Sequence, residues 1–114
     1  MSDPVTIYHN PRCTKSRQTL ELLQSKGVQP TVVEYLKTPP SADELKRILA
    51  ALNKGPREIL RAKEAAEAAI GKDLDDEALI AAMVANPIVI ERPIVVKGDK
   101  ACVGRPPESV LEIL

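Results

Sequence analysis

The spacing of hydrophobic residues near the amino end of the chain indicates a strand, a helix and a second strand. Residues 5–8 form a short β-rich run that stops at a turn-prone His-Asn-Pro segment. A helix is predicted from about Thr14, with leucines on one face, and Gly27 marks its end. Residues 31–36 form the second predicted strand. Two strands joined by a helix over so short a distance predict a βαβ unit, with parallel strands and a right-handed crossover.

The middle of the chain is predicted to be helical. Residues 41–44 form a capping box, and apolar residues follow at helical spacing. A second helix is predicted from Pro56 to Ile70, because proline is favoured in a first helical turn and an alanine-rich stretch follows. The acidic residues 75–77 suit the start of a third helix.

Alternating hydrophobic positions return near the carboxyl end. Residues 94–96 and 101–103 form two predicted strands, and Gly98-Asp99 between them is a two-residue hairpin signal that pairs Ile94 with Val103. Residues 106–114 could cover the sheet. The complete order, βαβ, helices, ββα, predicts an α/β chain with a thioredoxin-like fold: one domain over residues 1–114, a four-stranded mixed sheet, and a helical insertion at about 41–86.

Composition excludes several classes of protein. The 114 residues include sixteen Lys and Arg and sixteen Asp and Glu, so the formal net charge is zero and predicts neither a nucleic-acid groove nor a membrane surface. Two Cys and one His are too few for a disulfide framework or a closed zinc site. The chain shows no apolar run of about 20 residues and no signal peptide, so we expect a cytoplasmic protein with reduced thiols.

Cys13 is the strongest candidate for chemistry. It stands just before the first predicted helical turn, where unpaired N–H groups and the helix dipole stabilise a thiolate. Its neighbours are Arg, Thr, Lys, Ser and Arg, which an apolar pocket for an inert thiol would not tolerate. The thioredoxin-like order also predicts a cis peptide bond before Pro93, opposite this thiol.

The residues after Cys13 exclude two mechanisms. Ser16 makes the motif C-x-x-S, so a dithiol reaction within this loop is impossible, and Thr19 stands where a tyrosine-phosphatase loop would have arginine. Oxidised Cys13 must therefore be resolved by an external thiol or by Cys102. Because Cys102 lies among small apolar residues of a predicted strand, we interpret it as a core residue.

His9 and the arginines are the remaining candidates. His9 either polarises Cys13 or hydrogen-bonds the loop backbone, and the sequence leaves both roles open; no acidic or histidine cluster makes it a metal ligand. Arg92 and Arg105 each precede a proline, and the predicted hairpin brings them to the same end of the sheet. Two guanidinium groups there would suit a tetrahedral oxyanion.

The sequence resembles the glutaredoxin-coupled arsenate reductase (ArsC-like) family, and its short YfgD-like branch in particular. The motifs that carry the resemblance are residues 9–17 (HNPRCTKSR), 35–36, 39–40, 57–61 (REILR), 86–88, 91–96 (ERPIVV) and 104–108 (GRPPE). The resemblance covers nearly the whole chain, with the motifs in the same order.

The resemblance implies a mechanism. Cys13 would attack arsenate, whose oxygens Arg61, Arg92 and Arg105 would hold, while His9 and Ser16 keep Cys13 in its thiolate form. Glutathione would then attack the adduct as a co-substrate, glutaredoxin would reduce the mixed species, and arsenite would leave. No bound cofactor or metal is implied, and the partners would be arsenate and glutaredoxin, with the protein a monomer.

Two other classes share this fold. A regulator similar to the Spx proteins would bind RNA polymerase, although many of those carry C-x-x-C where this chain has Ser16. A monothiol glutaredoxin-like protein would act on mixed disulfides and would not need three converging arginines. Co-elution with the α subunit of RNA polymerase discriminates the first alternative, and arsenate-dependent NADPH oxidation tests the enzyme hypothesis.

Overall fold

The computed structural model describes residues 4–114, which form two compact units. The first contains the chain up to residue 38 together with residues 92–114, and the second contains residues 39–91. The second unit includes all the helices predicted for the insertion.

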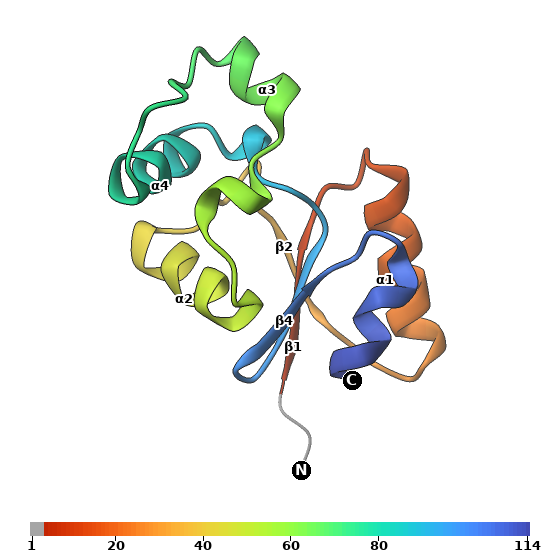
Figure 1. Cartoon of the computed structure of the whole chain (residues 1–114). Helices are drawn as coiled ribbons and strands as arrows, with labels where there is room; N and C mark the ends of the chain where they lie inside the picture. The colour runs from red at the N-terminus through yellow and green to blue at the C-terminus, as the bar shows by residue number, and fades with distance from the viewer. Residues whose placement is uncertain (1–3) are drawn as a thin grey trace. The chain divides into compact units, whose positions relative to one another are not determined.

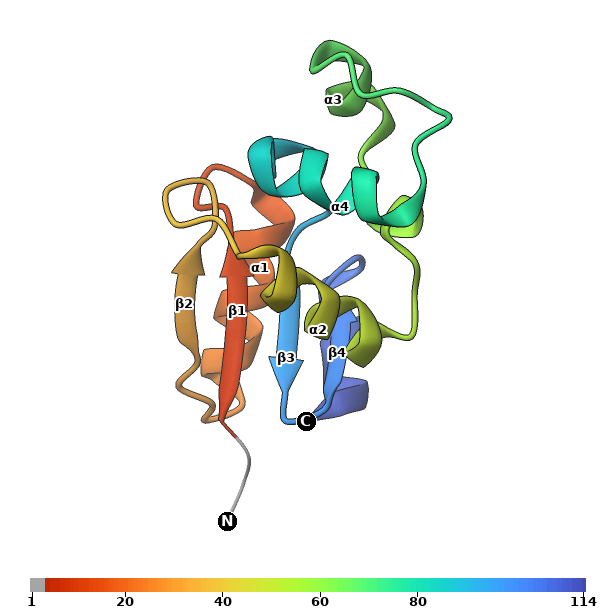
Figure 2. The same cartoon turned by 90° about the vertical axis from the view of Figure 1, so that its left-hand side faces the viewer.

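The first unit is built on a mixed sheet in the order β2-β1-β3-β4 (Figures 1 and 2). Its strands are β1 (Val5–His9), β2 (Thr31–Glu34), β3 (Ile94–Lys97) and β4 (Lys100–Val103). β1 and β2 are parallel, as the predicted βαβ unit requires, and β3 is antiparallel to both β1 and β4. Ile94 pairs with Val103 and Lys97 with Lys100, which confirms the two-residue hairpin.

Two helices lie on the same face of this sheet (Figures 1 and 2). They are α1 (Thr14–Ser25) and a 3₁₀ helix (Pro107–Ile113). The core between helices and sheet is aliphatic, and its buried members are Val5, Ile7, Leu23, Val95 and Val110. Gly27 follows α1 with a φ of 78°, a left-handed conformation that favours glycine and explains why the helix ends there.

The second unit is helical. Its elements are α2 (Ala42–Leu52), a 3₁₀ helix (Pro56–Ile59), α3 (Ala62–Glu67), α4 (Asp76–Ala85) and a 3₁₀ helix (Pro87–Val89). Both predicted helix starts are confirmed: Ser41 Oγ accepts from the Glu44 N–H at 3.1 Å at the start of α2, and Asp75 caps α4, with Asp76 and Glu77 in its first turn.

The prediction of one helix from Pro56 to Ile70 is wrong. The chain leaves the helical path at Leu60, which forms an isolated antiparallel bridge with Ile90. On either side of that bridge, the Arg61 N–H donates to the Val89 carbonyl and the Glu91 N–H donates to the Ile59 carbonyl, both at 2.7 Å. Backbone groups that a continuous helix would use internally are therefore taken by a distant segment.

Two further boundaries differ from the predictions. The second strand ends at Glu34 instead of residue 36, because the Glu34 carbonyl accepts from the N–H groups of Lys37 and Thr38 and turns the chain. The terminal segment is a 3₁₀ helix, with Pro107 in its first turn. Within residues 4–114, no helix is long and apolar enough to cross a bilayer.

Candidate active site

Cys13 occupies the N-cap position of α1. Its backbone is extended, with φ −91° and ψ 124°, and its carbonyl accepts the Arg17 N–H at 3.0 Å. The Cys13 N–H donates to the Asn10 carbonyl at 3.0 Å, which closes the loop that leaves β1. The thiol is half-buried, and the N–H groups of Lys15 and Ser16 in the first turn of α1 stabilise its charged form.

The surroundings of Cys13 favour its thiolate. Burial alone would raise the pKa of the thiol, but the Ser16 N–H, the Arg92 guanidinium and the Lys15 N–H all stabilise the charged form. The net effect is a pKa below the ordinary value of 9.0. A thiol with a lowered pKa carries more thiolate near neutral pH, and the thiolate is the nucleophile.

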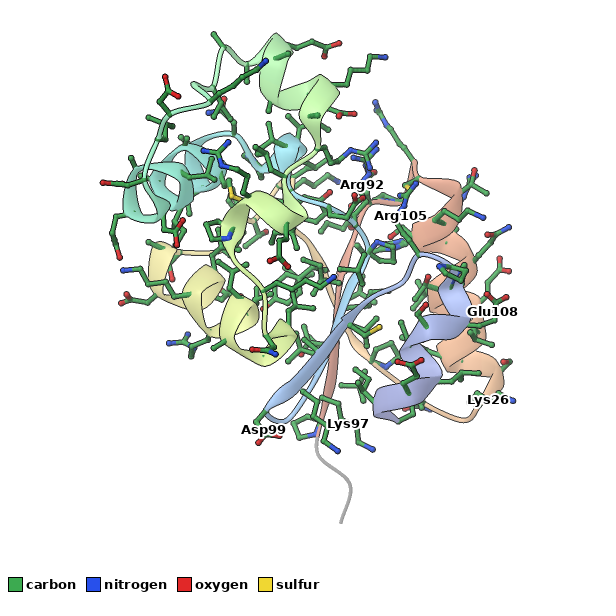
Figure 3. All side chains as sticks on the ribbon, viewed as in Figure 1. Lys26, Arg92, Lys97, Asp99, Arg105 and Glu108 are labelled. Atoms are coloured by element: carbon green, nitrogen blue, oxygen red, sulfur yellow. The ribbon has the colours of Figure 1, made fainter. Side chains whose placement is uncertain are left out.

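Arg92 and Arg105 meet at the end of the hairpin, as predicted (Figure 3). Arg105 Nη1 donates to the backbone carbonyl of Arg92 at 3.1 Å. The bond between Arg92 and Pro93 is cis, which confirms the prediction, and the bond between Arg105 and Pro106 is cis as well, which the sequence did not indicate. Two guanidinium groups thus lie in the same unit as Cys13, and that of Arg92 contacts the Cys13 thiol.

Thr19 ties α1 to the hairpin, and sequence reasoning missed this role. Its fully buried hydroxyl donates to the Lys15 carbonyl at 2.8 Å and contacts the Gly104 carbonyl at 3.4 Å. The Gly104 N–H in turn donates to the Pro93 carbonyl at 2.9 Å. The sequence offered one signal for this role: Thr19 is a polar residue on the apolar face of the predicted helix, and polar groups in such positions are nearly always hydrogen-bonded.

Ser16 organises the loop around Cys13 from its buried side. Its hydroxyl lies 2.6 Å from His9 Nδ1 and accepts the Asn10 N–H at 3.0 Å. Burial lowers the pKa of His9, and Glu34, its neighbour across the sheet, only partly opposes that effect. His9 thus contacts the loop through the Ser16 hydroxyl instead of the backbone, and its two predicted roles stay predictions.

Cys102 lies in β4, as expected, but it is half-buried instead of lying in the core as predicted. Its S–H contacts the carbonyls of Val103 and Ser109 at 3.4 and 3.3 Å. These contacts direct the sulfur toward the backbone of its own strand and of the 3₁₀ helix that follows.

Arg61 belongs to the second unit and immediately precedes α3, instead of lying within a helix as predicted. Its Nη1 lies 2.9 Å from Glu91 Oε1, and its Nη2 lies 3.2 Å from Glu64 Oε1. Burial would lower the pKa of Arg61, but the two carboxylates raise it overall. Its predicted contact with an oxyanion at Cys13 stays a prediction.

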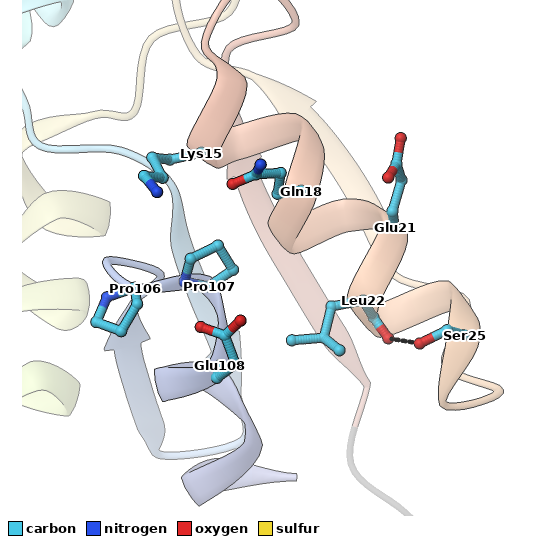
Figure 4. A pocket seen from close by; sticks show the side chains of 8 residues that line it. All are labelled: Lys15, Gln18, Glu21, Leu22, Ser25, Pro106, Pro107 and Glu108. Carbon is cyan, nitrogen blue, oxygen red and sulfur yellow. Dashed lines mark hydrogen bonds between the residues drawn. The ribbon is translucent and has the colours of Figure 1, made fainter.

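A groove of about 550 Å³ lies beside α1, along the 3₁₀ helix that ends the chain (Figure 4). Lys15 lines it at the start of α1, and Pro106, the residue after Arg105, lines it on the hairpin side. Among residues 4–114, no group of three His, Cys, Asp or Glu side chains is placed to hold a metal ion.

Comparisons with known proteins match nearly the whole chain to one family model and to several relatives. The model of the ArsC family matches residues 8–113. The YfgD protein of Escherichia coli (strain K12) is 52% identical, covering 100% of this chain and 99% of that protein, and an arsenate reductase of Haemophilus influenzae is 46% identical, covering 96% and 98%. A solved structure of an arsenate reductase from Vibrio cholerae superposes with a TM-score of 0.93 at 48% identity, covering 100% of both chains.

Proposed function

The chain belongs to the ArsC family, and from that premise we propose that it is a thiol-dependent oxidoreductase that reduces arsenate to arsenite. The observation that carries the proposal is the Cys13 thiol, which has a lowered pKa and lies at the first turn of α1 beside Arg92. Family members named arsenate reductase support the choice of oxyanion.

The first step joins Cys13 to arsenic. The thiolate attacks arsenic(V), a protonated arsenate oxygen leaves as water, and the arsenic keeps its oxidation state. The guanidinium groups of Arg92 and Arg105 would bind the remaining oxygens, since each planar pair of N–H donors matches two oxygens of a tetrahedral anion. Arg61 would add a third contact.

Reduction needs two further thiols. Glutathione adds its sulfur to arsenic and releases a second water molecule. The thiol of glutaredoxin then attacks the glutathione sulfur, forming a mixed disulfide and leaving two electrons on arsenic. Water releases arsenite from Cys13 and restores the thiol. In total, arsenate and two thiols give arsenite, one disulfide and one water.

His9 and Ser16 act in this mechanism as positioning residues. The Ser16 hydroxyl holds both the His9 ring and the Asn10 N–H, and the Ser16 N–H stabilises the Cys13 thiolate. The loop is therefore kept in the conformation that directs the sulfur at the substrate.

The test is coupled NADPH oxidation with glutathione, glutathione reductase and glutaredoxin. We expect oxidation that depends on both arsenate and glutaredoxin and disappears in Cys13→Ser. Sulfate in place of arsenate is the control for anion binding without reduction. Oxidation at the same rate without arsenate, or none with all components present, would refute the proposal.

A further inference from the structure

The groove beside α1 is lined by charges of both signs, with Lys15 and Glu21 on the α1 side and Glu108 on the facing side. Lys15, Gln18 and Leu22 line the α1 side, and Glu108 lies in the first turn of the facing 3₁₀ helix. Figure 4 shows these four side chains turned toward the space between the two helices, and Glu21 also lines the groove, with its carboxylate extending away from the other four. A cation, an amide and a carboxylate therefore face one hollow that is partly apolar.

The groove reaches the first turn of α1, the turn that directly follows the reactive thiol. Lys15 is two residues after Cys13, and its backbone N–H is one of the groups that stabilise the thiolate. Its side chain enters the groove. Lys15 thus connects the two places, and a molecule in the groove would extend toward Cys13 past the start of α1.

The proposed reaction requires an external thiol that reaches Cys13. Ser16 takes the place of a second thiol in the loop, so an external thiol must approach the adduct on Cys13. The volume of about 550 Å³ lies in the range of small-molecule sites, which is roughly 300–1,000 Å³. The groove is therefore large enough for part of a tripeptide thiol and lies in the same unit as Cys13.

We propose that this groove binds the γ-glutamyl arm of glutathione, an inference that rests on the proposed function. The arm carries an α-carboxylate and an α-ammonium group on one carbon atom. The carboxylate pairs with Lys15 and the ammonium with Glu108, while Gln18 can bond to either. This placement leaves the cysteinyl sulfur free to extend past Lys15 to Cys13.

The first experiment measures thiol–disulfide exchange without arsenate. The Cys13 thiolate attacks glutathione disulfide, forms a Cys13–glutathione disulfide and releases one glutathione thiolate, which intact-protein mass spectrometry follows over time. We expect Glu108→Gln to lower the second-order rate constant about two- to fivefold, the factor for one charged contact in an exposed groove. Glu112→Gln, on the same 3₁₀ helix but outside the groove, is the matched control.

A second disulfide isolates the γ-glutamyl group. The disulfide of N-acetylcysteinylglycine keeps the cysteinyl sulfur, the amide nitrogen and the glycine but lacks the charged groups of that arm, so Glu108→Gln should react with it as fast as the wild type does. Lys15→Met should show the same selective loss, with Lys26→Met, at the other end of α1, as its control. Equal slowing with both disulfides, or no slowing with glutathione disulfide, would overturn the proposal.

The steady-state assay separates this proposal from the proposed function. If the chain reduces arsenate, Glu108→Gln should raise the KM for glutathione by the same factor, with the KM for arsenate as wild type. If arsenate reduction fails while selective exchange with glutathione disulfide is observed, the groove assignment stands and the choice of oxyanion is wrong. If arsenate reduction succeeds without that selectivity, the groove assignment is wrong.

Discussion

Replacing Gly104 with alanine should disturb the contact between α1 and the hairpin. A Cβ atom at this position would lie 2.6 Å from Thr19 Oγ1 and 2.9 Å from Pro93 Cγ. Neither neighbour is a flexible side-chain end, because the Thr19 hydroxyl is buried and hydrogen-bonded and Pro93 is a rigid, buried ring. The backbone of β4 or the start of α1 must therefore move.

The size of the effect follows from two opposing terms. Over-packing a well-filled core costs about 1–3 kcal/mol. A glycine-to-alanine change recovers about 0.4–1 kcal/mol by restricting the unfolded chain. We therefore expect Gly104→Ala to lower the free energy of unfolding by roughly 1–2 kcal/mol, which corresponds to a fall in Tm of about 4–8 °C for a domain of this size.

A double-mutant cycle with Thr19→Ala tests the cause. Removing the Thr19 side chain makes room for the new methyl group, so the two changes together should cost about 1 kcal/mol less than the sum of their separate effects. Urea unfolding followed by far-UV circular dichroism gives all four free energies. Gly71→Ala is the matched control, because its added Cβ would meet only ordinary contacts, at 3.8 Å from Leu74 Cγ.

The same substitution should be visible at the active site. The Gly104 N–H holds the Pro93 carbonyl, and Pro93 follows Arg92, whose guanidinium stabilises the Cys13 thiolate. Displacing this segment should raise the pKa of Cys13, seen as slower alkylation near pH 6. Additive free energies in the cycle, or a Gly104→Ala protein more stable than the wild type, would refute the packing argument.

Three further predictions concern individual side chains. Brief iodoacetamide treatment near pH 6 should label Cys13 before Cys102, and preferential labelling of Cys102 would contradict this. In the same way, Cys13→Ser should abolish reductase activity, whereas Cys102→Ala should keep most of it. Arg92→Lys and Arg105→Lys should each lower kcat/KM for arsenate roughly ten- to a hundredfold, because lysine keeps the charge but loses the bidentate contact worth about 1.5–3 kcal/mol. If both variants keep wild-type rates and arsenate affinities, the two arginines are ordinary surface charges. The free energy of unfolding of Cys13→Ser, measured from pH 7.5 to 5.5, should decrease as the pH falls below 6.5, the pKa of His9 in the unfolded chain. The lowered pKa of His9 keeps its ring neutral in the folded state, whereas the unfolded chain takes up a proton. The slope cannot exceed about 1.4 kcal/mol per pH unit for one group, and a second substitution, His9→Asn, should remove it; an unchanged slope would refute the assignment.

Local patterns were enough to predict the elements that hold the active site. Each of these elements has its own local signal: a β-rich run for β1, a glycine just after the end of α1, and a Gly-Asp turn for the hairpin. The hairpin register then places Arg92 beside Arg105 with no further information, because the pairing of Ile94 with Val103 fixes which residues leave the strands together.

Contacts between distant segments explain what the sequence did not reveal. The helix predicted from Pro56 is interrupted because residues 59–61 bond to residues 89–91, a pairing that an alanine-rich local pattern cannot indicate. Gly104 and Thr19 are 85 positions apart, and their close packing depends on the assembled sheet and helix. The two carboxylates on Arg61 come from Glu64 nearby and from Glu91, which is 30 positions away.

The orientation of Ser16 gives the C-x-x-S spacing a structural meaning. Its N–H points toward the Cys13 sulfur, whereas its fully buried hydroxyl points toward His9 and Asn10. The Ser16 side chain faces the inner side of the loop, and the residue type, serine instead of cysteine, is what leaves this position without a resolving thiol. Cys102 offers no substitute, because its S–H is directed at backbone carbonyls of β4 and of the helix that follows. Resolution of an adduct on Cys13 must then come from the solvent side of the loop, where Lys15 leads into the groove beside α1.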